Sequence, residues 1–126
     1  MIFDIVKTGG GEIFLAVLFR GDFFLKIIKT LSKHINDEIE DALHYAKLAL
    51  KYKDENKALA TAFYTLSTEE LKHATMLHGE AVKIIEEYRK TNGEPPAAML
   101  AVYNYLHEEQ IEKTQKVKNY QQMFRE

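Results

Sequence analysis

The sequence predicts an all-α protein: an up-down antiparallel helical bundle of three long helices, preceded by an apolar N-terminal segment. Apolar residues recur every three or four positions along most of the chain, which is the periodicity of amphipathic helices. Only 2 prolines and 6 glycines occur in 126 residues, too few for a protein of many strands and turns. The composition, 46% hydrophobic and 29% charged, is ordinary for a folded globular domain.

Residues 1–29 form an apolar lead-in that differs from the rest of the chain. They hold five of the 7 phenylalanines and the triplet Gly9-Gly10-Gly11. The longest apolar run, Ile13–Phe19, is far shorter than the ~20 residues that a membrane span needs, so we expect no membrane span. The segment from Glu12 to about Ile28 is interpreted as a short helix, an irregular cover or a subunit contact.

Residues 30–126 are predicted to form the bundle domain, and its first helix is expected over Lys29–Lys53. The spacing of the apolar residues in this stretch is helical. The residues of this apolar stripe are Leu31, Ile35, Ile39, Ala42, Ala46 and Ala49.

The second helix is expected to begin after Asp54, a good N-cap residue, and to end near Lys90, ahead of Gly93. Its apolar stripe is Leu59, Phe63, Leu66, Leu77, Ala81, Ile84 and Tyr88. Pro95 and Pro96 suit the first turn of a third helix. The apolar face of that helix is Met99, Val102, Leu106, Val117, Tyr120 and Phe124. Because both connections are short, neighbouring helices should run antiparallel.

Polar residues interrupt each apolar stripe near its middle: Glu38 in the first helix, Glu70 and His73 in the second, and Glu109 in the third. Glu70 and His73 are three positions apart, so they share a helix face. Carboxylates that converge in a bundle core need a compensating positive charge, since burying them alone costs several kcal/mol. A divalent metal supplies that charge, and carboxylates with one imidazole suit iron or manganese, while zinc would also bind.

The other acid and histidine residues are weaker candidates. Asp41 and His44 are also three positions apart but lie off the apolar stripe, so a solvated face is expected for them. Glu40 would replace Glu38 if the inward face were shifted by half a turn. We expect three further histidines at the surface: His34, His78 and His107.

A family resemblance appears in the same residues. The segment Glu69–Leu77 reads E-E-x-x-H-A-x-x-L and resembles the corresponding segment of ferritin-like proteins. Glu38, followed by Tyr45 and Ala49, is similar to the first-helix pattern of rubrerythrins and encapsulated ferritins. The resemblance, which covers residues 31–90, implies a di-iron carboxylate site that oxidises Fe(II) with oxygen or peroxide. It implies Glu38, Glu70 and His73 as ligands and catalytic residues, with Tyr45 as their neighbour.

The chain departs from the family pattern in one respect. A complete four-helix member has a second E-x-x-H, and the predicted third helix has none. Two completions are open. A homodimer or higher homo-oligomer could bring together two sets of Glu38, Glu70 and His73, as encapsulated ferritins do. Alternatively, Glu109 with Glu112 could complete the site within one chain.

Charge and cysteine content exclude several classes of protein. The net charge of −2 lacks the basic footprint of a nucleic-acid binder, so no nucleic-acid partner is expected. The absence of cysteine excludes thiol catalysis and Cys-ligated metals, and it fits a cytoplasmic location. The alternative function is a non-enzymatic helical interaction protein without metal. In that protein the inward polar residues would fix helix register, and the Phe-rich start would bind a partner.

Overall fold

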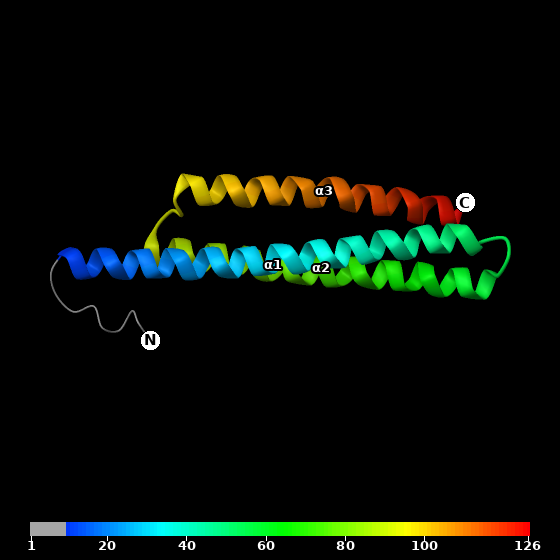
Figure 1. The fold of residues 1–126 in the computed structure, drawn as a ribbon, viewed down its shortest axis with the longest axis horizontal. Coiled ribbons are helices and arrows are strands. Elements are labelled where there is room, and N and C mark those ends of the chain that lie inside the picture. The colour runs from blue at the N-terminus through cyan, green and yellow to red at the C-terminus, as the bar shows by residue number, and fades with distance from the viewer. Residues whose placement is uncertain (1–9) are drawn as a thin grey trace.

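The computed structural model describes the backbone of residues 10–126 and the side chains of residues 21–126. These residues form three helices and no strand: α1 (Gly10–Tyr52), α2 (Lys57–Asn92) and α3 (Ala97–Arg125). Each helix runs antiparallel to the one before it (Figure 1). The predicted all-α fold with three long packed helices is therefore confirmed. Within the described part of the chain, no helix combines the length and apolarity that a transmembrane segment requires.

The first helix is much longer than expected. α1 begins at Gly10 and continues for 43 residues, without a break near residue 29. Residues 10–28 are thus the first part of α1 and neither a separate short helix nor an irregular cover. Phe24 and Ile28 pack in a buried cluster with residues of α2, and the rings of Phe24 and Tyr88 lie 4.6 Å apart. The earlier residues of the predicted lead-in, 1–9, lie outside the described part.

The helix ends correct two details of the prediction. Asn56, and not Asp54, caps α2: its side-chain oxygen accepts a hydrogen bond from the backbone N–H of Leu59 at 3.1 Å. Pro96 precedes α3, which begins one residue later, so the prolines stop short of the first turn. Gly93 ends α2 as expected, with φ of 78°, a conformation that favours glycine.

Small residues line the contact between α1 and α2. Ala42, Ala46 and Ala49 on α1 have no exposed surface. The buried line on α2 repeats every seven residues and is Ala60, Ser67, Ala74, Ala81 and Tyr88. Because four of these five side chains are small, the two helix axes can approach closely. This line takes the core position that the sequence had assigned to larger residues: Leu59 and Leu66 of the predicted stripe are 38% and 36% exposed.

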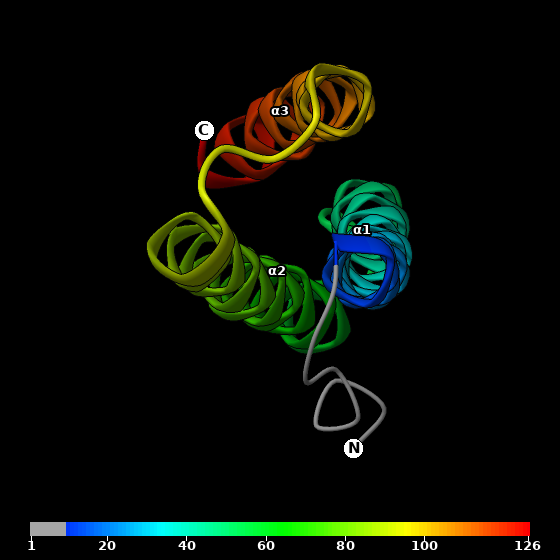
Figure 2. The same cartoon turned by 90° about the vertical axis from the view of Figure 1, so that its left-hand side faces the viewer.

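A buried hydrogen-bond chain joins all three helices at Ser67. The Ser67 hydroxyl donates to the carbonyl of Ala42 at 2.7 Å and accepts from the Gln121 side-chain amide at 2.9 Å. Further along, the Gln110 amide donates to the carbonyl of Ser32 at 3.1 Å. Viewed end-on, α1 lies beside both α2 and α3 (Figure 2). The two glutamines and the serine therefore fix how α3 sits on the α1–α2 pair.

Replacing Ser67 by alanine tests this chain. Ser67→Ala removes the acceptor of the buried Gln121 amide, and an unsatisfied buried group costs about 1–3 kcal/mol. We expect the free energy of unfolding in urea to fall by that amount. Thr68→Ala is the matched control, since the Thr68 hydroxyl bonds only to the carbonyl of Thr65 in its own helix. Equal stability of the two variants would show that the hydrogen bonds of Ser67 contribute little.

Candidate metal centre

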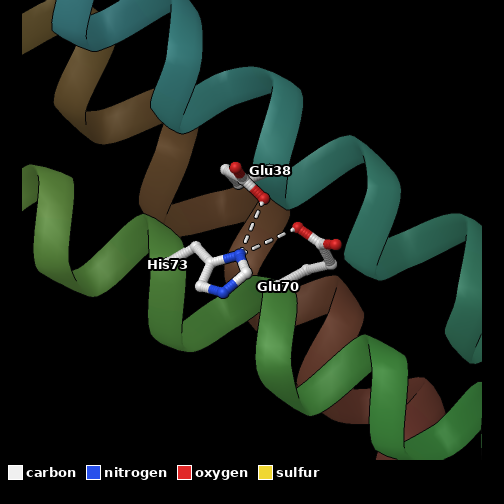
Figure 3. Close-up of side chains that lie close together, drawn as sticks. All are labelled: Glu38, Glu70 and His73. Atoms are coloured by element: carbon white, nitrogen blue, oxygen red, sulfur yellow. Dashed lines mark ion pairs between the residues drawn. The ribbon is translucent and has the colours of Figure 1, made fainter.

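Three of the predicted ligands meet between the first two helices (Figure 3). Glu38 comes from α1, and Glu70 and His73 come from one face of α2. Nδ1 of His73 lies 3.5 Å from a carboxylate oxygen of Glu38 and 3.4 Å from one of Glu70. One donor atom of each residue lies within 4.8 Å of the other two. Residues that are 32 positions apart along the chain thus form one compact group.

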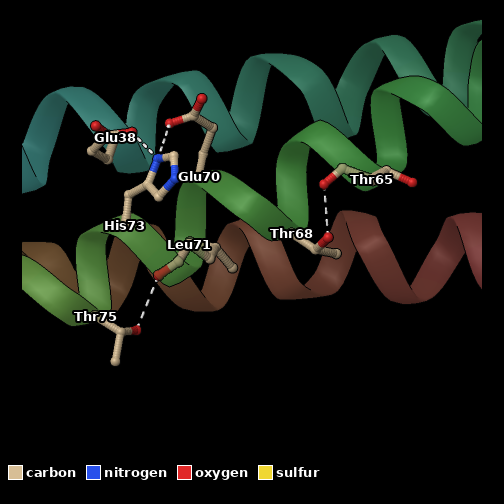
Figure 4. A network of polar contacts seen from close by, with 7 residues as sticks. All are labelled: Glu38, Thr65, Thr68, Glu70, Leu71, His73 and Thr75. Atoms are coloured by element: carbon tan, nitrogen blue, oxygen red, sulfur yellow. Dashed lines mark hydrogen bonds and ion pairs between the residues drawn. The ribbon is translucent and has the colours of Figure 1, made fainter.

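Nearby hydroxyls on α2 are engaged elsewhere. Thr68 donates to the carbonyl of Thr65 at 2.8 Å, and Thr75 donates to that of Leu71 at 3.0 Å (Figure 4). Both bonds run from a side-chain hydroxyl to a backbone carbonyl of α2 itself. The oxygen donors identified in the group are the carboxylates of Glu38 and Glu70.

The group lies at the edge of the helix pair and not in its core. The side chains of Glu38 and Glu70 are 28% and 19% exposed, while that of His73 is 53% exposed. The prediction that His73 points into the bundle is wrong. Ala74 takes the core position. His73 is the residue before it, so its side chain points about 100° away from the core direction around the helix axis. The site is half-buried, with its imidazole toward solvent.

Glu38 points away from α3. Asn36 and Glu40 both contact Lys113 of α3, at 3.4 Å and 3.0 Å. Glu38 is two positions from each of these residues, and two positions on a helix correspond to about 200° of rotation. Glu38 therefore faces the side of α1 opposite to α3. Figure 3 accordingly draws α3 behind the group. Glu40 pairs with α3 and does not replace Glu38.

The third helix brings no carboxylate to the group. Glu109 instead accepts a hydrogen bond from the hydroxyl of Tyr105 at 3.0 Å, and this bond and the carboxylate charge raise the pKa of Tyr105. Glu109 lines a hollow with Lys29 and Lys33 of α1, on the α3 side of that helix. Glu112 is exposed on α3 and is not part of the group either.

The remaining candidates divide into two sets. Asp41, His44 and His34 are exposed, as expected. His78 and His107 were expected at the surface, and for them the expectation is wrong: both are partly buried, and their rings stack at 4.7 Å with an interplanar angle of 14°. No periodic signal marked this pair, because the two residues lie on different helices, α2 and α3.

Tyr45, which the resemblance implies as a neighbour of the ligands, belongs to an aromatic cluster on the same side of the helix pair. The ring of Phe63 stacks on Tyr45 and on Tyr52, at 6.1 Å in each case. Tyr45 and Tyr52 follow Glu38 at steps of seven, and Glu70 follows Phe63 at the same step. Seven residues are close to two helical turns, so each set shares a face. We call this side of the α1–α2 pair the open face, and the seven-residue spacing was the signal for it.

The donor set fits a divalent metal ion. Metal–ligand distances of about 2.0–2.2 Å put neighbouring donor atoms about 3–3.5 Å apart. The distances between His73 and the two carboxylates match this range. Among residues 21–126, no lysine or arginine forms an ion pair with Glu38 or Glu70. Two adjacent carboxylates with only an imidazole beside them have negative charge to spare for a cation.

Comparison of the chain with protein families, with characterised proteins and with solved structures found no match. No family is therefore assigned, and the resemblance of residues 31–90 to ferritin-like proteins stays a prediction that rests on the motif.

Metal binding can be tested without iron chemistry by titrating metal-free protein with Mn(II). We expect calorimetric binding and a rise in melting temperature, since free metal at about 100 times Kd adds about 2.7 kcal/mol to stability. Glu70→Gln and His73→Gln should each weaken binding by about tenfold or more. The double variant Asp41→Asn, His44→Gln is the control, because it removes an acid and a histidine at the same spacing on an exposed face. Equal losses in the control would contradict the assignment.

Proposed function

We propose that the chain is a ferritin-like di-metal protein. Glu38, Glu70 and His73 of two copies would hold two divalent metal ions, iron first, with manganese or zinc as alternatives. The proposed activity is the oxidation of Fe(II) by oxygen or peroxide. The observation that carries the proposal is the meeting of three donor atoms, from two helices, within 4.8 Å of one another.

One copy supplies too few ligands for two ions. Two carboxylates and one imidazole leave coordination positions open even around one ion. Two copies related by a twofold axis would supply four carboxylates and two imidazoles, which is the ligand set of di-iron carboxylate bundles. Completion within one chain is less well supported, because Glu109 lies on the α3 side of α1 and Glu38 faces away from it.

The open face has the character of a subunit contact. Leu59 and Leu66 of α2 are exposed large apolar residues, and Phe23 of α1 is 52% exposed. A hollow of about 440 Å³ lies farther along the α1–α2 pair, lined by aromatic and aliphatic side chains and a few polar ones. Its lining residues are Phe23, Phe24, Ile27, Ile84, Glu87, Tyr88, Thr91 and Asn92. Apolar surface of this kind around a half-buried polar group is typical of an interface.

The side chains of the site would serve the chemistry in three ways. Bound iron would supply one-electron exchange between its +2 and +3 states. The four carboxylates of a dimer would hold the two ions and balance their charge. His73 is exposed in one copy, and a facing copy would cover it and limit the access of water. As substrate, two Fe(II) ions give up two electrons, enough to reduce one peroxide to two waters with two protons.

Fe(II) oxidation is the direct test of the activity. Protein loaded anaerobically with Fe(II) should consume oxygen or peroxide and form Fe(III). An oxygen electrode measures the oxygen consumption, and absorbance measures the formation of Fe(III). We expect Glu38→Gln and Glu70→Gln to slow this by about tenfold or more, because each removes a charged ligand. The Asp41→Asn, His44→Gln variant should keep the rate of the unchanged chain. Full rates in the Glu70 variant would rule out this site.

The dimer is tested separately by placing a charge on the open face. Leu66→Glu leaves every proposed ligand in place but buries a carboxylate in the contact, which costs several kcal/mol. We expect it to be a monomer with reduced metal content, by size exclusion with mass detection and elemental analysis. Val102→Glu is the control, since Val102 is an exposed apolar residue of α3, which contributes no residue to the open face.

A Leu66→Glu dimer with full metal content would place the contact elsewhere. A chain that binds no metal as monomer or dimer would favour the alternative, a helical interaction protein.

A further inference from the structure

A second candidate site lies on the other side of the helix pair from the open face. It is a cavity of about 300 Å³, bordered by all three helices. Its apolar part is formed by Ile35 and Ile39 of α1 and by Leu71 and Ala74 of α2. This volume is at the lower end of the range for small-molecule pockets. The remaining lining residues are Thr75, His78, His107, Gln110, Ile111, Thr114, Gln115 and Lys118.

Two stacked imidazole rings, those of His78 and His107, form one wall of the cavity. The ring of His107 stacks on that of His78 at 4.7 Å and on that of Tyr103 at 5.8 Å, with interplanar angles of 14° and 5°. Burial and the neighbouring His107 lower the pKa of His78, which favours its neutral form. Nδ1 of His107 is buried and has no hydrogen-bond partner in the described part of the chain. The wall therefore has a flat apolar surface and unused hydrogen-bonding capacity.

Three of the seven polar side chains in the lining hydrogen-bond within the protein. Thr75 donates to the carbonyl of Leu71, Gln110 to that of Ser32, and Gln115 to the side chain of Asn119. Lys118 differs: it is exposed and makes no ion pair among the described residues. The lining contains no aspartate or glutamate. An uncompensated cation thus lies beside an apolar cavity.

We infer that this cavity binds a small amphipathic monocarboxylate. Its apolar body would occupy the space beside Ile35, Ile39 and Leu71, and its carboxylate would pair with the ammonium group of Lys118. A single lysine with no arginine in the lining suits one negative charge better than a phosphate group, which carries more charge and more acceptor oxygens. The half-enclosed shape and the apolar lining suit a short apolar chain.

The probe is octanoate, titrated by calorimetry into metal-free protein so that the candidate metal centre has no part in the result. We expect saturable binding of one octanoate per chain and weaker binding of 1-octanol, which lacks the charge. Lys118→Gln should weaken octanoate binding by about tenfold, because it removes one charge-assisted hydrogen bond. It should leave 1-octanol binding unchanged. Lys116→Gln is the matched control, an exposed lysine on the same helix that does not line the cavity.

A second variant tests the apolar part. Thr114→Trp places a large side chain in the cavity from a partly buried position on α3 and should abolish binding of both probes. Circular dichroism checks that it folds, and unchanged Mn(II) titration checks that the other face is intact. No saturable octanoate binding would overturn the inference. Equal effects of the two lysine variants, or full binding by folded Thr114→Trp, would overturn it as well.

Discussion

The close packing of α1 on α2 is the constraint on which the rest of the structure depends. Alanines on α1 and a line of alanine and serine on α2 hold the two helices side by side. The hydrogen bond from Ser67 to the carbonyl of Ala42 fixes their register. With that register, Glu38 lies opposite Glu70 and His73. A shift of one turn, about 5.4 Å, would separate the carboxylate of Glu38 from the imidazole.

The same packing gives the helix pair two different sides. On one side, α3 contacts α1 through Lys113 and the buried glutamines, and the cavity beside His78 and His107 lies next to it. On the other side, no helix among residues 10–126 covers the Glu–Glu–His group and the aromatic rings around Phe63. A bundle of three helices necessarily leaves part of its surface uncovered. In this chain the uncovered α1–α2 face is the one that carries the convergent donors, which is why the proposal requires a second copy.

The sequence predicted the number of helices and the extent of α2 and α3 because periodicity and turn residues are local signals, but it placed the start of α1 near residue 29, whereas α1 begins at Gly10. The three helices, the glycine end of α2 and the approach of Glu38 to Glu70 and His73 all follow from spacing. The depth of these residues did not follow, because large apolar residues were taken to mark the core. On α2, small residues mark it over most of the contact with α1: Ala60, Ser67 and Ala74. The partners of Glu109 and the stacking of His78 on His107 depend on how α3 sits against the other helices, and no spacing within one helix reveals that.

Native mass spectrometry of the chain loaded with Mn(II) tests the shared centre most directly, because it counts chains and ions in the same particle. If the centre is shared, the particles should contain an even number of chains and one bound ion per chain, so that each dimer carries two. Monomers, where present, should retain no ion at matched free metal. Monomers that carry two ions, or dimers that carry none, would contradict a shared centre.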